Sequence, residues 1–269
     1  PAEARADEVP AHADPEVAAA PRDLVRAVEP LVDPEAVVSG VPPVVDGAME
    51  LDFLNMTEST MVLDHLKFAD RKPIPAYTGV DVQEEVIARL LALNPDRFLV
   101  VTDEAVEKHH ASYLDALGST GIPVHRIVLP CGDQCKSMRH LQRLIDWSFE
   151  SGGTRSSVVV GFGGGALMNV TGLFAGIVYR GFRLVYVPTT LLAMHDVTTS
   201  LKTSICHWGR KNNIGVYYAA TLILMDLAFC LTLPQDELLS GLGELCKNAA
   251  LFGGDHAKGF VGAFSKNLL

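Results

Sequence analysis

The sequence is poor in cysteine and shows no leader-like N-terminus. Its five cysteines among 269 residues are odd in number and irregularly spaced, which argues against a disulfide framework and is typical of a reducing compartment. The first residues have neither a basic region nor an apolar core, so the sequence predicts no signal peptide. Together these absences predict a cytoplasmic protein.

Basic stretches are also lacking. Of the net charge of −10, residues 1–50 carry −8, because they hold eleven acidic and three basic residues. The same segment contains eight of the fifteen prolines. We therefore expect residues 1–55 to form a solvated, disordered tail. The remainder is nearly neutral and has no basic stripe, so we expect no nucleic-acid partner.

One uncharged stretch, residues 158–179, is long enough to imitate a membrane span. It begins with a short β-branched run and continues into three consecutive glycines, Gly163, Gly164 and Gly165. A buried strand, a tight turn and a helix explain this pattern better than a membrane span. We expect no membrane association.

Strand and helix patterns alternate through the middle of the chain. The predicted strands are residues 61–67, 74–77, 98–102, 124–129, 158–161, 182–187 and 221–226. The predicted helices are residues 81–93, 104–117, 137–150, a segment running to residue 179, and a helix that Thr232 would cap. This alternation predicts an α/β fold with a Rossmann-like parallel sheet over residues 56–230. Residues 231–269 would begin an α-helical domain.

Polar or glycine residues follow four of the predicted strands. These residues are Asp103, Asp133 with Lys136, the glycines 163–165, and Thr189 with Thr190. Since the carboxyl ends of parallel strands meet at one edge of a sheet, we expect a single ligand crevice there. Glycines at the start of a helix let a ligand approach the backbone, and the first helical N–H groups can bind an anion.

A second polar group follows the strand at 182–187 and comprises Asp196, Lys202, Lys211 and Asn212. Lysines bind phosphate as point charges, and Asp or Asn side chains orient hydroxyl groups. The pattern therefore predicts a site for a polyhydroxylated anion, with a solvated loop as the alternative. The uncharged run at 197–201 predicts that Lys202 is partly buried beside a partner.

The helix after Thr232 carries Gly241, Glu244, Lys247 and Asn248 on one face, at spacings of three or four residues. Glu244 is a candidate metal ligand, but an ion pair with Lys247 explains the same spacing and is the more frequent outcome. Because glycine is costly inside a helix, Gly241 and Gly243 predict a close approach of another backbone.

Six motifs occur in a familiar order: GDQCK (132–136), GFGGG (161–165), RGFRLVYVPTTLLA (180–193), SLK (200–202), KNNIG (211–215) and SGLGELCKN (240–248). From about residue 60 to about residue 255, the sequence resembles the sugar phosphate cyclases, whose best-known member is 3-dehydroquinate synthase. This resemblance implies a nucleotide-binding domain, a helical domain, and a site between them for NAD and a divalent metal, Zn²⁺ or Co²⁺.

The resemblance also implies individual roles. Residues that would bind or adjoin NAD are Asp103, Asp133, Lys136, Gly163, Gly164, Gly165, Asn169, Thr189 and Thr190. Residues that would bind the sugar phosphate are Asp196, Lys202, Lys211, Asn212, Lys247 and Asn248, with Arg180 reaching the site of a partner subunit. Lys202, Glu244 and Lys247 would be catalytic, and Glu244 would also be a metal ligand. The implied homodimer follows from the role of Arg180.

The implied enzyme is a carbon–oxygen lyase that oxidises a sugar phosphate with NAD, eliminates phosphate, returns the hydride and closes a carbocycle. Asn169, the SLK triplet, Tyr217 and Tyr218 look most like 2-deoxy-scyllo-inosose synthases, which act on glucose 6-phosphate in aminoglycoside antibiotic pathways. A 2-epi-5-epi-valiolone synthase, acting on sedoheptulose 7-phosphate, and a 3-dehydroquinate synthase are the alternatives.

One departure concerns the metal. The family completes its metal site with two histidines well beyond the glutamate helix, whereas this sequence ends 25 residues after Glu244. The single later histidine, His256, does not occupy the family's motif. We therefore expect a truncated or split cyclase that needs a complementing C-terminal chain, or a homologue that binds NAD without catalysis.

Overall fold

The structure is a computed structural model that describes residues 61–66 and 73–267. All the described residues belong to one compact unit. The predicted tail, residues 1–55, lies outside the described residues. The domain boundary after residue 230 stays a prediction.

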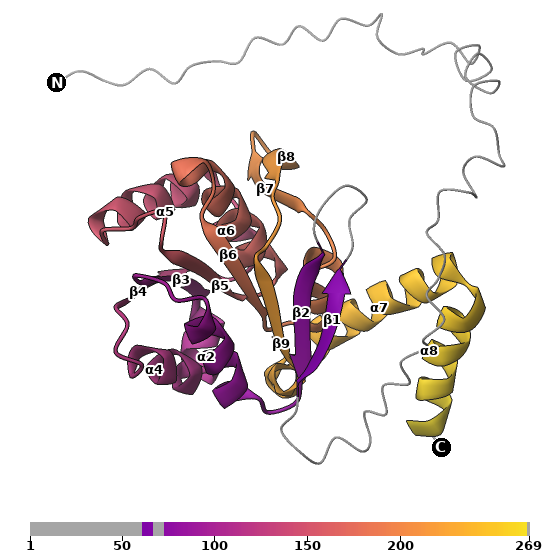
Figure 1. The fold of residues 1–269 in the computed structure, drawn as a ribbon. Helices are drawn as coiled ribbons and strands as arrows, with labels where there is room; N and C mark the ends of the chain where they lie inside the picture. The colour runs from indigo at the N-terminus through magenta and orange to yellow at the C-terminus, as the bar shows by residue number, and fades with distance from the viewer. Residues whose placement is uncertain (1–60, 67–72, 268–269) are drawn as a thin grey trace, which may run out of the picture. The chain divides into compact units, whose positions relative to one another are not determined.

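A seven-stranded sheet forms the centre of the described chain (Figure 1). Its strands are β1 (Val62–Leu66), β2 (Ile74–Gly79), β3 (Phe98–Asp103), β4 (Val124–Leu129), β5 (Val158–Gly163), β6 (Arg183–Pro188) and β9 (Leu222–Asp226). Their order across the sheet is β1-β2-β9-β6-β5-β3-β4. Only β1 is antiparallel to its neighbour; the other six strands run parallel. The predicted α/β fold with a parallel sheet is confirmed.

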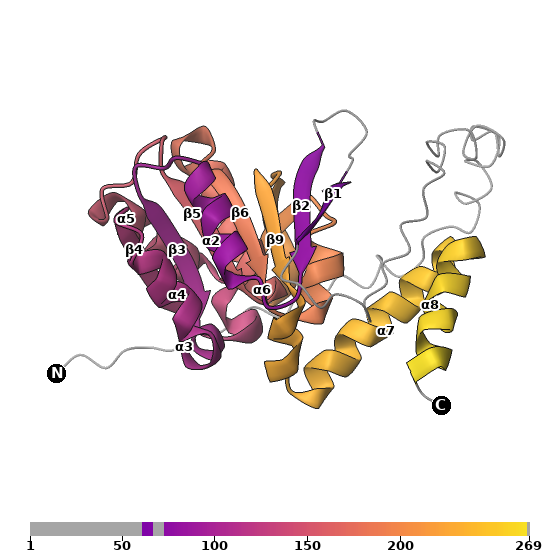
Figure 2. The ribbon, with the colours of Figure 1, turned by 60° about the horizontal axis from the view of Figure 1, so that its bottom comes forward.

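Helices cover both faces of the sheet (Figure 2). They are α2 (Gln83–Ala92), α3 (Glu104–His109), α4 (Ala111–Gly118), α5 (Met138–Glu150) and α6 (Gly165–Ile177). Along β3, Leu99 and Val101 pack in the core with α5 and α6, whereas Phe98 and Val100 pack in the core with α2 and α4. Because successive strand residues point to opposite faces, a continuous apolar run serves two cores at once.

The segment from 104 to 117 is two helices rather than one. The break falls at His110, whose φ of −132° and ψ of 28° are not helical. Its imidazole Nε2 lies 3.0 Å from the hydroxyl of Thr232, and its ring packs edge-on against Phe229. These tertiary contacts explain the interruption, which helical periodicity alone does not reveal.

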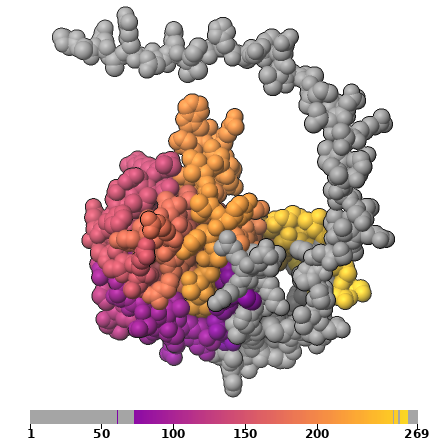
Figure 3. Space-filling model, turned by 45° about the horizontal axis from the view of Figure 1, so that its top comes forward, coloured from indigo at the N-terminus to yellow at the C-terminus, as the bar shows by residue number. Residues whose placement is uncertain are grey.

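Residues 202–217 form a β-hairpin, whereas the sequence pattern predicted no strands there and a solvated loop was the alternative. Strand β7 (Lys202–His207) pairs with β8 (Arg210–Tyr217), and the hairpin stands out from the layered part of the protein (Figure 3). Trp208 and Gly209 make the turn with φ angles of +53° and +68°. The polar sequence hides these strands because all eight residues of β8 are exposed.

Helices α7 (Gln235–Phe252) and α8 (Gly254–Asn267) end the described chain. The predicted cap at Thr232 is wrong, since the N-cap of α7 is Pro234. Thr232 instead ends a 3-10 turn, η5 (Leu227–Thr232), where its hydroxyl donates to the carbonyl of Phe229. In the described residues, no helix is both long enough and apolar enough to cross a membrane.

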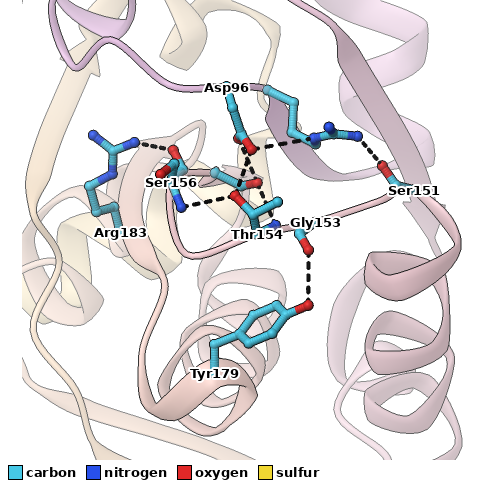
Figure 4. Close-up of polar contacts among 9 residues, drawn as sticks. Asp96, Ser151, Gly153, Thr154, Ser156, Tyr179 and Arg183 are labelled. Atoms are coloured by element: carbon cyan, nitrogen blue, oxygen red, sulfur yellow. Dashed lines mark hydrogen bonds and ion pairs between the residues drawn. The ribbon is translucent and has the colours of Figure 1, made fainter.

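A polar network joins the loop before β5 to its neighbours (Figure 4). The carboxylate of Asp96 accepts hydrogen bonds from the hydroxyls of Thr154 and Ser157, at 2.5 and 2.8 Å. The hydroxyl of Tyr179 donates to the carbonyl of Gly153 at 2.9 Å. These bonds hold the amino-end edge of the sheet, which leaves the opposite, carboxyl-end edge for the candidate site.

Candidate active site

The chain changes direction across the sheet between β3 and β5. From β3 it passes outward to the edge strand β4, and then returns to the other side of β3 to form β5 and β6. Ligands of open parallel sheets bind beyond the carboxyl ends of the strands at such a reversal. Asp103 ends β3 there, and its Oδ1 accepts from the amides of Ala105 and Val106, 3.0 Å away.

The glycine run lies directly beside Asp103. A Cβ built on Gly163 would lie 2.8 Å from Oδ2 of Asp103, and one on Gly164 would lie 3.3 Å from the Thr190 methyl group. The amide of Thr189 donates to the carbonyl of Gly163 at 2.9 Å. The structure thus brings the predicted ends of β3, β5 and β6 together, and side chains larger than glycine would fill the space between them.

Helix α6 begins in this turn without a side-chain cap at Gly164. The first amides of an α-helix have no partner within the helix, and the helix dipole favours negative charge at this end. The start of α6 therefore fits a phosphate or pyrophosphate group, because the glycines leave the backbone accessible.

A polar pocket of about 470 Å³ adjoins the first turns of α6. Four predicted site residues line it: Asn169, Asp196, Lys202 and Asn212. The other lining residues had no predicted role at the site, although Ser200, Asn213, Gly215 and Tyr217 belong to the motifs of the resemblance. They are Val197, Ser200, Thr203, Ser204, Asn213, Gly215, Val216 and Tyr217. Three of the four residues of the predicted anion site, Asp196, Lys202 and Asn212, thus line one cavity between α6, a π-helical turn η4 (Ala193–Val197) and the hairpin, while its use as a substrate site stays a prediction.

The prediction that Lys202 is partly buried is wrong. Its side chain is exposed, because Lys202 starts strand β7 at the rim of the pocket. The buried lysine of this region is Lys136, which is 6% exposed and donates from Nζ to Oδ1 of Asn212. Lys136 follows the 3-10 turn η2 (Gly132–Cys135), and its carbonyl accepts from the amide of Cys206 on β7 at 2.9 Å, so it lies against the hairpin.

Asp133 and Lys211 form an ion pair across the same junction, with 2.8 Å between Oδ2 and Nζ. The hydrogen bond from Lys211 lowers the pKa of the Asp133 carboxyl. Both side chains are more than half exposed, so this pair orders the hairpin against η2 but adds little stability.

Three predicted residues, Glu244, Lys247 and Asn248, lie on α7 and do not line the pocket. Nζ of Lys247 donates to Oε1 of Glu244, which is the ion pair that the spacing predicts. Among residues 61–66 and 73–267, no group of three or more His, Cys, Asp or Glu side chains could hold a metal ion. Glu244 and the rest of the described chain therefore do not form a metal site by themselves.

Of the two helix glycines, only Gly241 is in a close approach. A Cβ there would lie 2.7 Å from Cβ of Leu191, whereas one on Gly243 would meet nothing within 4 Å. Arg180 is exposed and lies past the end of α6 opposite to its glycine-rich start. Within this chain it does not line the pocket.

Parts of this chain are similar to known proteins. The family model for the N-terminal part of 3-dehydroquinate synthase matches residues 126–240. A 2-deoxy-scyllo-inosose synthase of Streptomyces ribosidificus is 40% identical over 172 residues, covering 64% of this chain and 44% of that protein. A 3-dehydroquinate synthase of Alkaliphilus metalliredigens is 34% identical over 160 residues, covering 60% of this chain and 45% of that protein. The chain thus spans less than half the length of these relatives.

Solved structures are also similar to part of this chain. A crystal structure of 2-deoxy-scyllo-inosose synthase, complexed with carbaglucose-6-phosphate, NAD⁺ and Co²⁺, has a TM-score of 0.62 and 28% identity. The similar region covers 70% of this chain and 52% of the chain in that crystal structure. A 2-epi-5-epi-valiolone synthase from Streptomyces hygroscopicus subsp. jinggangensis, with NAD⁺ and Zn²⁺ bound, has a TM-score of 0.60 and 27% identity, covered to 50% by 67% of this chain.

Proposed function

Because the chain belongs to the 3-dehydroquinate synthase-like family of sugar phosphate cyclases, we propose that it forms the NAD-binding half of a sugar phosphate cyclase. The proposed reaction is that of a 2-deoxy-scyllo-inosose synthase, with glucose 6-phosphate as substrate and phosphate elimination as its lyase step. The 2-deoxy-scyllo-inosose synthase of Streptomyces ribosidificus is 40% identical, compared with 34% for the 3-dehydroquinate synthase, and this difference supports the choice.

The observation that carries the proposal is that Asn169 belongs both to the start of α6 at the glycine turn and to the polar pocket. Its Nδ2 donates to the carbonyl of Gly165, 2.9 Å away in the glycine turn, and its side chain also lines the polar pocket. A cofactor on the start of α6 and a substrate in the pocket would therefore be neighbours. NAD, when bound, would supply a hydride acceptor beside the pocket.

The chain's own residues would hold the cofactor in a specific way. The free amides at the start of α6 would bind the pyrophosphate, and Asp103, Thr189 and Thr190 would border it. The two hydroxyl side chains lie beside this turn, where the absence of Cβ atoms lets the cofactor approach the backbone.

The pocket residues would hold the substrate. Lys202, at the rim, would attract the phosphate as a point charge, whereas Asp196 and Asn212 would orient hydroxyl groups. Lys211 does not line the pocket, and it would reach the phosphate only after leaving its ion pair with Asp133. Glu244, Lys247 and Asn248 would contribute from α7, with Glu244 as one metal ligand among others that the described residues do not provide. We therefore derive no reaction step through a metal.

Calorimetry with NAD is the first test. We expect the chain to bind NAD, and we expect Gly164→Leu to abolish binding because its side chain would fill the space beside Thr190 at the start of α6. Gly243→Ala is the control, since a Cβ there meets nothing within 4 Å. Equal NAD binding by Gly164→Leu and the unaltered chain would contradict the proposed site.

Phosphate release is the second test. The chain would be assayed with NAD, Co²⁺ and either glucose 6-phosphate or sedoheptulose 7-phosphate, alone and with the C-terminal half of a 2-deoxy-scyllo-inosose synthase. We expect release from glucose 6-phosphate with the added half. Release only from sedoheptulose 7-phosphate would assign the chain to the valiolone reaction instead.

A second candidate function is NAD binding without catalysis. It is favoured by the pairing of Glu244 with Lys247 and by the lack of a metal-binding group in the described part of the chain. NAD binding without phosphate release under any of these conditions would support this candidate, and release of phosphate would exclude it.

A further inference from the structure

Four polar side chains from four separate elements meet at one wall of the pocket. They are Lys136 after η2, Asn169 on α6, Ser204 on β7 and Asn212 on β8. The Ser204 hydroxyl lies 3.4 Å from Oδ1 of Asn169 and 3.2 Å from Oδ1 of Asn212. Ser204 is only 8% exposed, and neither composition nor spacing singled it out.

Each of the side-chain amides of Asn169 and Asn212 has one partner that can only accept or only donate a hydrogen bond. That partner fixes the orientation of the amide. The carbonyl of Gly165 can only accept, so Nδ2 of Asn169 must face it and Oδ1 must face Ser204. The ammonium group of Lys136 can only donate, so Oδ1 of Asn212 must face it. These two contacts decide the amide assignments on chemical grounds.

Ser204 therefore stands between two carbonyl oxygens with one proton to donate. It can donate to only one oxygen at a time, and the lone pairs of its Oγ remain for a donor from the pocket. Asn212 lines the pocket and its Oδ1 is occupied by Lys136 and Ser204, which leaves its Nδ2 group as the donor that it can offer to a ligand. One acceptor and one donor thus lie side by side on this wall.

We propose that Ser204 is a specificity-determining residue that, together with Asn212, recognises one hydroxyl group of a sugar phosphate. The hydroxyl would donate its proton to Oγ of Ser204, and its oxygen would accept from Nδ2 of Asn212. Asn169 and Lys136 act as positioning residues. Asn169 offers its amide oxygen to the Ser204 proton, and Lys136 fixes the amide of Asn212, so the Ser204 proton is directed away from the ligand. This inference rests on the proposed function for the class of ligand.

Such an arrangement would favour a ligand that carries the hydroxyl. When the hydroxyl is absent, Oγ of the buried Ser204 loses a donor, whereas the exposed Asn212 can donate to water instead. The affinity for inorganic phosphate is not expected to depend on Ser204. Ser204 therefore separates recognition of the sugar from attraction of the phosphate, which the exposed lysines provide.

Calorimetric affinities would test the recognition. The full chain and Ser204→Ala would be titrated with glucose 6-phosphate, with each of its monodeoxy analogues, and with inorganic phosphate. For one analogue we expect about a tenfold loss of affinity in the unaltered chain and no further loss in Ser204→Ala. Equal losses in both proteins for every analogue would overturn the inference. Equal phosphate binding by both is expected.

Spectra of the side-chain amides in the ligand-free protein would test the network independently of any substrate. Ser204→Ala should shift the ¹⁵N–¹H signals of Asn169 and Asn212, assigned with Asn→Ser variants, whereas the exposed control Ser112→Ala should not. Unchanged amide signals in Ser204→Ala would overturn the inference. If the signals shift but neither glucose 6-phosphate nor sedoheptulose 7-phosphate binds, the proposed function fails and the ligand assignment of Ser204 fails with it.

Discussion

Nε2 of His195 lies 3.1 Å from the carbonyl oxygen of Gly241, and this contact joins the π-helical turn η4 to the middle of helix α7. A carbonyl can only accept, so Nε2 donates in this contact. Nδ1 is buried without a hydrogen-bond partner among the described residues. His195 is next to Asp196 in the pocket wall, so the contact links the polar pocket to the helix that carries Glu244.

We predict that His195→Ala loosens α7 without unfolding the sheet. Loss of this hydrogen bond should cost about 1 kcal/mol. Amide hydrogen exchange should accelerate in α7 while the exchange of β3 and β5 stays slow. His207→Ala, which changes an exposed histidine on the hairpin, is the control. Unchanged exchange in α7 of His195→Ala would show that the contact does not hold the helix.

The two helix glycines should respond in opposite directions to alanine. Gly241→Ala would place a Cβ 2.7 Å from Leu191, so it should lower the free energy of unfolding by about 1–3 kcal/mol. Gly243→Ala meets open space inside the same helix and should raise that free energy by up to about 1 kcal/mol. Urea denaturation would measure both. A stabilising Gly241→Ala would contradict the packing of α7 on Leu191.

Asp226 is a buried acceptor at the end of β9, with 1% of its surface exposed. Its carboxylate accepts from the amides of Asp81, Val82 and Ala228 and from the hydroxyl of Tyr113. Asp226→Asn would turn an NH₂ group toward these donors and should cost about 3 kcal/mol.

Tyr113→Phe removes one donor to Asp226 and leaves the three amide donors in place. We expect a smaller loss in denaturant unfolding, of about 1–2 kcal/mol. The control is Tyr217→Phe, because Tyr217 is 70% exposed and should change stability by less than about 0.5 kcal/mol. If the two tyrosine variants lost equal stability, the buried hydroxyl would not contribute to the cluster.

His110 should make the fold less stable in mild acid. Burial lowers its pKa below the ordinary value, with a smaller contribution from the neighbouring His109. Below an unfolded-state pKa of about 6.5, the unfolded chain therefore binds a proton that the folded chain resists, so stability is lost as the pH falls through that range. His110→Gln should flatten the dependence of unfolding free energy on pH between 7.5 and 5. The exposed-residue variant His207→Gln should leave the slope unchanged, and an unchanged slope in His110→Gln would refute the assignment.

Much of the fold follows from local pattern. Each of the strands at 98–102, 158–161 and 182–187 is a short apolar run, and such runs are buried on both faces of a parallel sheet. The position of the site follows from the same pattern, because the ends of parallel strands share one edge of the sheet. Asp103, the three glycines and Thr189 could therefore be predicted as neighbours.

The pocket wall could not be predicted in the same way. The hairpin strand β8 begins with four polar residues and has no buried residue, so its sequence does not predict a strand. The hairpin packs on α6, mainly through β7. Lys202 is exposed where partial burial was expected, and Lys136 is buried, because burial depends on which segment packs over a side chain. Sequence spacing does not contain that information.

By itself, the sequence determined the α/β class, the shared edge at which the strands end and the glycine turn at the start of α6, because each depends on local apolar runs and backbone freedom. The tertiary structure alone decided that Ser204 lies between Asn169 and Asn212, that His195 meets Gly241, and that Lys136 rather than Lys202 is buried. Each of these contacts joins side chains from separate elements, so it exists only after the elements have packed.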